Sequence, residues 1–290
     1  MPDRSDLIYR YNGELPGLLC CVFESRRTGR LPLNIWEEWE PCTSLAPELT
    51  IPASREEAAQ VWRSLRRLSP TGAHWVEVSF LSGEEGKAMD LHDFVWETFE
   101  RGQDITGFLG DPVVARVFGL QRQVHNEAHL FLEFLRFREQ QGVLCAQIEP
   151  KSFVLPLMGG HFAARFPGEA FLIHDITHGA ALLHQGGRME IYPLEELSLD
   201  ALSPAEEEYQ QLWQRYYDTI AIRERYNPKC RMGHCPKRFW KHMLEMEGPG
   251  RRGNPAPRGI PAARVVARKG RAVTPARPRV RWRVCWYPQA

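Results

Sequence analysis

Four groups of residues in this 290-residue sequence have side chains and a spacing that could support chemistry. The first lies in a predicted long helix, where His125 and His129 are four residues apart and therefore share one face. At about 100° per residue, Arg122 and Arg136 fall on the same flank, which predicts contact with phosphate or another anion. Two alternatives stay open: a solvated face whose charge Glu133 partly cancels, and a metal site held by the two histidines.

The second group is Cys230, His234 and Cys235, which could supply three zinc ligands. No second Cys or His pair follows at the spacing of a zinc finger, so we predict no bound metal. The sequence also has no Gly-x-x-x-x-Gly-Lys-Ser/Thr or Gly-x-Gly-x-x-Gly motif. We therefore predict no cofactor.

The third group consists of histidines in a region rich in predicted strands, namely His161, His174, His178 and His184. His174 precedes Asp175 and could form an oriented base with it. No Gly-x-Ser-x-Gly nucleophile motif accompanies the pair. The alternative is that these histidines lie in turns or on the surface, and Gly159-Gly160 is interpreted as a turn.

The fourth group is a basic and aromatic run near the C-terminal end, in which Lys237, Arg238 and Lys241 alternate with Phe239 and Trp240. Cations could hold phosphates there while an aromatic ring stacks on a base. The alternative is an amphipathic C-terminal helix whose rings pack on the body while the cations stay in water.

The elements that must position these groups follow from capping signals and hydrophobic period. A capping box from Ser54 to Glu57 opens one helix, and Asp111-Pro112 opens a longer one that is predicted to reach about residue 140. The Pro-rich stretch 30–52 is predicted to be irregular. Further helices are predicted around residues 73–82, 89–101 and 204–226, and strands at 7–13, 143–148, 152–157, 170–176, 179–183 and 188–192. This order predicts an α+β fold, with helical N-terminal and C-terminal parts around an antiparallel β-meander.

Composition predicts a folded body and a tail of different character. Residues 248–290 hold ten Arg, one Lys, seven Pro and no Asp or Glu, and they are predicted to form a disordered basic tail. Residues 1–247 then carry a net charge of −10 and are predicted to form a single domain. Because the sequence has no long apolar run and its seven cysteines are irregularly spaced, we predict a cytoplasmic protein without membrane contact.

Several blocks resemble a known family when they are taken together. The sequence is similar to the bacterial DNA metabolism or repair proteins built on the DUF4130 domain, over about residues 7–247. The blocks that carry this resemblance include Tyr11-Asn-Gly-Glu-Leu-Pro-Gly-Leu-Leu, Asp111-Pro-Val-Val, Leu155-Pro-Leu-Met-Gly-Gly-His161-Phe-Ala-Ala-Arg165-Phe, Leu212-Trp-Gln-Arg-Tyr-Tyr-Asp and Pro236-Lys-Arg238-Phe-Trp240.

The resemblance implies a role in DNA repair through genomic context. Proteins of this family are usually encoded beside a radical-SAM protein of the DNA-photoproduct-lyase type, and some are fused to a uracil-DNA glycosylase domain. Residues of this chain that match family-motif positions are Glu127, His129, Arg136, His161, Arg165, Glu224, Arg225, Asn227, Lys237, Arg238 and Trp240. The chain departs from the pattern at Ala128, where the family tends to have a basic residue, and at Asn126.

The leading hypothesis is a DNA-binding protein that acts with a radical-SAM repair protein on DNA, including damaged or single-stranded DNA. Its predicted DNA-binding residues are Arg122, His129, Arg136, Arg165, Arg225, Lys237, Arg238 and Trp240. One alternative is a protein–protein adaptor for the same partner without DNA contact. The other is a glycosylase-like or hydrolytic enzyme on damaged DNA, with Glu127, His129 and His161 as candidate catalytic residues.

Overall fold

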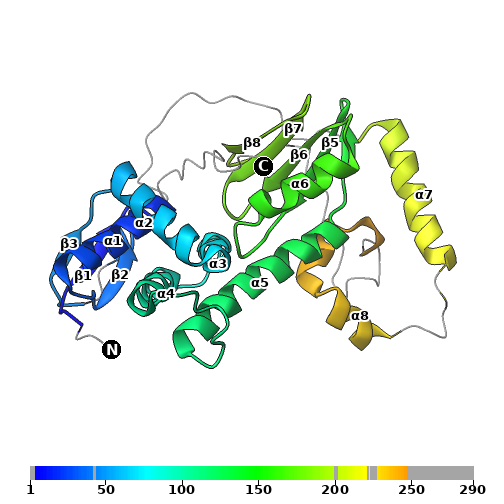
Figure 1. Ribbon diagram of the computed structural model, residues 1–290. Helices are drawn as coiled ribbons and strands as arrows, with labels where there is room; N and C mark the ends of the chain where they lie inside the picture. The colour runs from blue at the N-terminus through cyan, green and yellow to red at the C-terminus, as the bar shows by residue number, and fades with distance from the viewer. Residues whose placement is uncertain (1–3, 42–43, 199–201, 221, 223–226, 247–290) are drawn as a thin grey trace. The chain divides into compact units, whose positions relative to one another are not determined.

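The computed structural model describes residues 4–41, 44–198, 202–220, 222 and 227–246 (Figure 1). Arg225 and the predicted basic tail, residues 248–290, lie outside this range. The described chain forms two compact units. Unit 1 runs to Asn126 and also includes Lys151–Phe153, and unit 2 contains the other described residues.

Unit 1 contains a parallel sheet of three short strands. The strand β1 (Ile8–Tyr11) lies between β2 (Asn34–Glu37) and β3 (Glu48–Thr50) and pairs in parallel with both. The predicted strand at 7–13 is therefore confirmed. The prediction of an irregular stretch at 30–52 is wrong in part, because β2 and β3 are too short for their apolar period to be recognised.

The helices of unit 1 begin where the capping signals place them. The Ser54 hydroxyl accepts a hydrogen bond from the backbone N–H of Glu57, and Asp111 Oδ1 accepts one from the N–H of Val113 at 2.9 Å. The helices are α1 (Leu15–Thr28), α2 (Arg55–Leu68), α3 (Pro70–Phe80), α4 (Lys87–Arg101) and α5 (Pro112–Phe134), the last of which continues into unit 2.

The core of unit 1 lies between its sheet and its helices. Large side chains from the sheet, such as Tyr9 and Tyr11, and from the helices, such as Leu65 and Phe94, are fully buried. One polar ring lies among them: His92 is fully buried, and its Nε2 atom is 2.9 Å from Ser25 Oγ. Burial lowers the pKa of His92, so the ring is neutral at pH 7.

Unit 2 is built on a five-strand sheet in the order β4-β5-β6-β7-β8. All neighbouring strands are antiparallel except β5 and β6, which are parallel. The α+β class is thus confirmed, whereas the antiparallel meander is correct only in part. The strands are β4 (Arg138–Gln140), β5 (Val143–Ile148), β6 (Ala170–Asp175), β7 (Ala180–Gln185) and β8 (Arg188–Pro193).

The helix α6 (Leu155–Arg165) connects β5 to β6, as a parallel pair requires a crossover. It begins within the segment 152–157, so the prediction of a strand there is wrong. Gly159 lies inside this helix rather than in a turn. A Cβ atom at Gly159 would come within 2.2 Å of the Met189 sulfur, so a larger residue there would displace the end of the Met189 side chain.

The C-terminal part of unit 2 is helical. It comprises α7 (Pro204–Ile220), α8 (Pro228–His234) and two 3₁₀ helices, η2 (Lys237–His242) and η3 (Leu244–Met246). The predicted helix at 204–226 is confirmed as far as Ile220. Among the described residues, no helix is both long enough and apolar enough to cross a bilayer.

Candidate nucleic-acid interface

Residues 227–243, here called the basic segment, contain three of the predicted DNA-binding residues, namely Lys237, Arg238 and Trp240. The segment has five Lys or Arg residues, two His and no Asp or Glu. It starts with α8, where the Asn227 side chain caps the helix by accepting a hydrogen bond from the N–H of Cys230 at 3.0 Å. Pro236 has no backbone N–H and follows the end of α8, and η2 begins after it.

Two buried aromatic rings attach the basic segment to unit 2. Phe239 is 5% exposed and contacts Phe131 of α5 edge-on, with ring centroids 4.7 Å apart. Trp240 is 6% exposed, and its indole N–H donates to the carbonyl of Cys235 at 2.9 Å. With both rings covered, the structure agrees with the alternative in which the aromatic side chains pack on the body. Their faces are not open to a stacking base.

Ion pairs with acidic residues of unit 2 also hold the basic segment against this unit. Arg238 Nη1 lies 3.2 Å from Glu127 Oε1 of α5, and Glu127 is only 4% exposed. Glu149, which follows β5, pairs with both Lys241 and His242. Because a buried carboxylate is costly without a cation, Glu127 has a clear structural role as the partner of Arg238. Its predicted role as a catalytic base is untested.

A further ion pair involves Glu245, near the C-terminal end of the described residues. Arg136 Nη2 is 2.6 Å from Glu245 Oε1, and the indole N–H of Trp213 donates to Glu245 Oε2 at 3.1 Å. Burial acts to raise the pKa of Glu245, but the hydrogen bonds from Arg136 and Trp213 and the Arg136 charge hold that pKa below its usual value. The same balance, with Lys241 and His242 as the cations, lowers the pKa of Glu149.

Two lysines of the basic segment point to solvent without an ion pair to another described residue. These are Lys229 on α8 and Lys237 at the start of η2, and both are exposed. Lys241 and Arg238 also remain exposed, at 62% and 41% of their side chains, although each contacts a carboxylate. The sequence prediction of a basic and aromatic run included Lys237, Arg238 and Lys241 but missed Lys229. The absence of acidic residues from 227 to 243 was the signal that could have found Lys229.

The helix flank on α5 differs from its prediction at one end. Arg122 is exposed, and His129 is 70% exposed with Nε2 3.0 Å from Glu133 Oε1. Arg136 lies beyond the helix, which ends at Phe134, so its predicted place on the helical flank is wrong. The reason is the early start of β4. Arg136 instead contacts the C-terminal part of unit 2.

His125 is half-buried and lies beside His74, with ring centroids 5.8 Å apart. Burial lowers the pKa of His125, and the nearby His74 lowers it further. A neutral ring contributes no charge to the flank at pH 7, so the cationic part of the flank on α5 is Arg122.

His161 and Arg165 are both exposed on α6, four residues apart and therefore on one face of the helix. The ring of His161 contacts Phe162 edge-on, with centroids 5.1 Å apart, and the Arg165 guanidinium lies 5.7 Å from the Phe166 ring. Their exposure permits contact with an anion. Neither is joined to the basic segment by a contact among the described residues.

Comparison with protein families gives a match to the DUF4130 family model, described as a domain of unknown function, over residues 85–245. The chain belongs to the DUF4130 family. Comparison with curated proteins and with solved structures finds no match of comparable significance. The matched range includes every predicted site residue from Arg122 to Trp240, and it ends at Glu245, the partner of Arg136.

The histidine cluster in the sheet of this DUF4130 domain pairs differently from the prediction. Asp175 is fully buried and accepts a hydrogen bond from His178 Nδ1 at 2.6 Å, whereas His174 Nε2 contacts the carbonyl of Leu194 at 3.0 Å. The predicted pair of His174 and Asp175 is therefore wrong. Side chains at consecutive strand positions point to opposite faces, and the turn after β6 brings His178 back to Asp175. Burial raises the pKa of Asp175 in spite of this partner.

Within the part of the DUF4130 protein that the structure describes, no three His, Cys, Asp or Glu side chains are grouped as metal ligands would be. Cys230 is exposed, while Cys235 is buried with its sulfur 3.7 Å from the Met243 sulfur. Burial raises the pKa of the Cys235 thiol. A zinc ligand is a thiolate, so this environment opposes zinc binding by Cys235.

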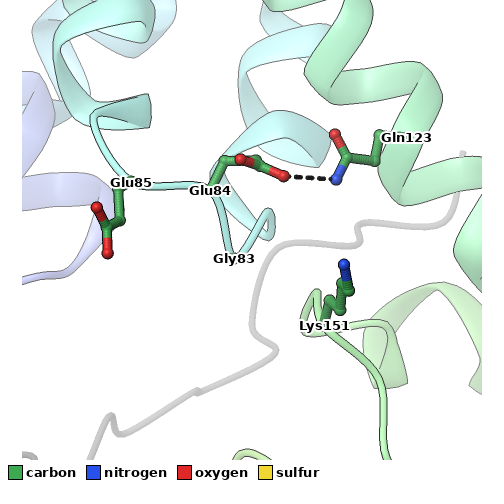
Figure 2. Close-up of a pocket in the computed structure, with 5 residues that line it drawn as sticks. All are labelled: Gly83, Glu84, Glu85, Gln123 and Lys151. Carbon is green, nitrogen blue, oxygen red and sulfur yellow. Dashed lines mark hydrogen bonds between the residues drawn. The ribbon is translucent and has the colours of Figure 1, made fainter.

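Unit 1 of the DUF4130 protein has an open polar pocket of about 480 Å³, lined by Gly83, Glu84, Glu85, Gln123 and Lys151 (Figure 2). Gln123 Nε2 donates a hydrogen bond to Glu84 Oε1 at 2.8 Å, and the Lys151 side chain points toward this pair (Figure 2). A Cβ atom at Gly83 would come within 2.2 Å of the Lys151 carbonyl oxygen. None of the predicted site residues lines this pocket, and its carboxylates are exposed.

Proposed function

We propose that this DUF4130 protein binds DNA through the phosphate backbone and acts in DNA repair or DNA metabolism. The observation that carries the proposal is the basic segment, an acid-free stretch whose two rings, Phe239 and Trp240, are buried and whose three lysines are exposed. Exposed Lys and Arg side chains neutralise phosphates, and such contacts supply sequence-independent affinity. Burial of Phe239 and Trp240 favours phosphate contact without base stacking by these rings.

The body of the protein limits the size of this interface. Residues 1–247 carry a net charge of −10, which argues against a broad cationic face, so in the proposal a bound duplex contacts a local patch. Lys229, Lys237, Lys241 and the exposed part of Arg238 form that patch in the proposal, and the basic tail adds further charge. We propose the radical-SAM repair protein as the partner, on the strength of the family resemblance.

The exposed lysines give the sharpest test, because Arg238 also holds Glu127 and its loss would disturb the fold. In the full chain, Lys229→Ala with Lys237→Ala is expected to weaken binding to a fluorescent duplex roughly tenfold at low salt. The measurement is fluorescence anisotropy, and near-ultraviolet circular dichroism checks that packing is unchanged.

The matched control removes two charges from α2 by Arg63→Ala with Arg66→Ala, both exposed residues of unit 1. This control is expected to bind DNA as the wild type does. Equal losses in both double variants would show that affinity follows net charge alone, and an unchanged affinity in the lysine variant would contradict the proposed interface.

A further inference from the structure

Two histidines of unit 1 lie side by side on neighbouring helices. His74 is exposed on α3 and His125 is half-buried on α5, and their ring centroids are 5.8 Å apart with the ring planes tilted by 39°. Both residues belong to unit 1, whose elements pack as one compact body. The rings are neither stacked nor edge-on, so contact between the rings does not by itself account for the arrangement.

Packing between α3 and α5 holds the two rings in place. Trp75 of α3 contacts Phe118 of α5 with ring centroids 5.1 Å apart. The Ser79 hydroxyl of α3 donates a hydrogen bond to the carbonyl of Val117 of α5 at 3.1 Å. The backbones that carry the two histidines are therefore fixed by contacts that do not involve the histidine side chains.

The ring nitrogens of the two histidines are available to a ligand. Among the described residues, neither His74 nor His125 has a hydrogen-bond or ion-pair partner. His129, four residues further along α5, differs because its Nε2 atom is 3.0 Å from Glu133 Oε1. An imidazole nitrogen without another partner can coordinate a metal ion. Because His74 is exposed and His125 is only half-buried, an ion from solution can reach the pair.

The separation of the rings fits an ion between them. A metal–nitrogen bond of about 2.0–2.1 Å places a coordinated metal about 3.2 Å from the centroid of an imidazole ring. Two such rings have centroids about 5.2 Å apart at the tetrahedral angle and about 6.4 Å apart when they coordinate from opposite sides. The observed 5.8 Å lies between these limits. We propose that His74 and His125 bind a divalent transition-metal ion through their imidazole nitrogens.

The surroundings of the pair permit a weakly held cation. Glu77 of α3 and Arg122 of α5 lie one helical turn from the pair and carry opposite charges. Two protein ligands leave the remaining coordination positions to water. The ion is therefore held less tightly than by four protein ligands, and its dissociation constant is expected in the micromolar range. Because each helix supplies one ligand, the bound ion cross-links α3 to α5.

The test is histidine-selective ¹⁵N NMR of the full chain during titration with Zn²⁺. Coordination changes the nitrogen chemical shifts of the imidazole that binds the ion, so each histidine reports separately. The resonances of His74 and His125 are expected to shift together with one shared midpoint. His74→Ala is expected to weaken the zinc response of His125 at least about tenfold. Since His74 is exposed, this variant is expected to stay folded.

The matched control is His129→Ala, which removes an exposed histidine of the same helix and leaves the pair intact. Its His74 and His125 resonances are expected to respond to zinc as those of the wild type do. A response of His125 that is unchanged in His74→Ala, or lost in His129→Ala, would overturn the proposal. Wild-type protein in which neither His74 nor His125 responds up to about 1 mM zinc would also overturn it.

Discussion

Replacing Arg136 with alanine is expected to lower the free energy of unfolding of unit 2 by about 2–3 kcal/mol at pH 7. The change removes a cation 2.6 Å from Glu245, whose side chain is 3% exposed. Loss of one partner from a fully buried pair typically costs about 3–5 kcal/mol, and the 26% exposure of Arg136 justifies the lower figure. Urea denaturation followed by circular dichroism measures the loss.

The pH dependence of this stabilisation follows from the direction in which the pKa of Glu245 is shifted. This pKa is lower in the folded protein than the ordinary value of 4.5, so the pair contributes stability above about pH 4.5 and loses it as the pH falls further. The difference between wild type and Arg136→Ala is therefore expected to shrink in acid. Glu245→Gln is expected to reduce the cost of removing Arg136.

The control for this prediction is Arg165→Ala, because Arg165 is exposed on α6. Its effect is expected to stay within about 0.5 kcal/mol, as is usual for surface positions. If Arg136→Ala is no more destabilising than Arg165→Ala, the ion pair with Glu245 does not hold the C-terminal part of unit 2, and Arg136 is free for the role in DNA binding that the sequence predicted.

Replacing Phe239 with alanine is expected to release the basic segment from unit 2. Phe239 is 5% exposed and packs on Phe131, and the loss of a buried phenyl ring costs about 3–5 kcal/mol. The basic segment can open locally without unfolding of the rest of unit 2. Amide exchange of residues 237–246 is therefore expected to accelerate more than about 100-fold. Hydrogen exchange with mass spectrometry measures this.

The strands β6 and β7 serve as the internal reference, because their exchange is expected to change little. Phe108→Ala is the matched control: Phe108 is 49% exposed in unit 1, and its loss is expected to leave the basic segment protected. The same variants separate fold from binding. Phe239→Ala keeps every cation, so a loss of DNA affinity in it would indicate that the proposed interface depends on the shape of the segment as well as on its charge.

Local signals predicted the fold where the controlling interactions are close in the sequence. Residues within a few positions of each other determine the caps at Ser54 and Asp111 and the apolar period of α5. These features could therefore be predicted from the sequence. The segment 152–157 was not, because short apolar runs fit a strand or a helix equally well. The parallel pairing of β5 with β6 decides between them, and that contact joins residues about 27 positions apart.

The candidate site shows the same division. Net charge and the acid-free stretch from 227 to 243 predict a cationic surface. Which cations of the basic segment form ion pairs depends on Glu127 and Glu149, which lie far from it in the sequence. Glu245 likewise pairs with Arg136, which lies 109 residues earlier in the chain. The burial of Trp240 likewise depends on tertiary packing, so the sequence left base stacking and packing of the ring on the body as alternatives, and only the structure decides between them.

The measurement that tests the central claim most directly is DNA binding over a salt series by the chain truncated after Gly248, compared with the full chain. The truncated chain keeps all described residues and lacks the basic tail. We predict that it binds duplex DNA. The logarithm of its association constant should fall linearly with the logarithm of the salt concentration. Lys229→Ala with Lys237→Ala should make that slope shallower by about 2, since each phosphate contact contributes about 0.9. Binding by the full chain alone, with none by the truncated chain at low salt, would contradict the account and assign the affinity to the tail.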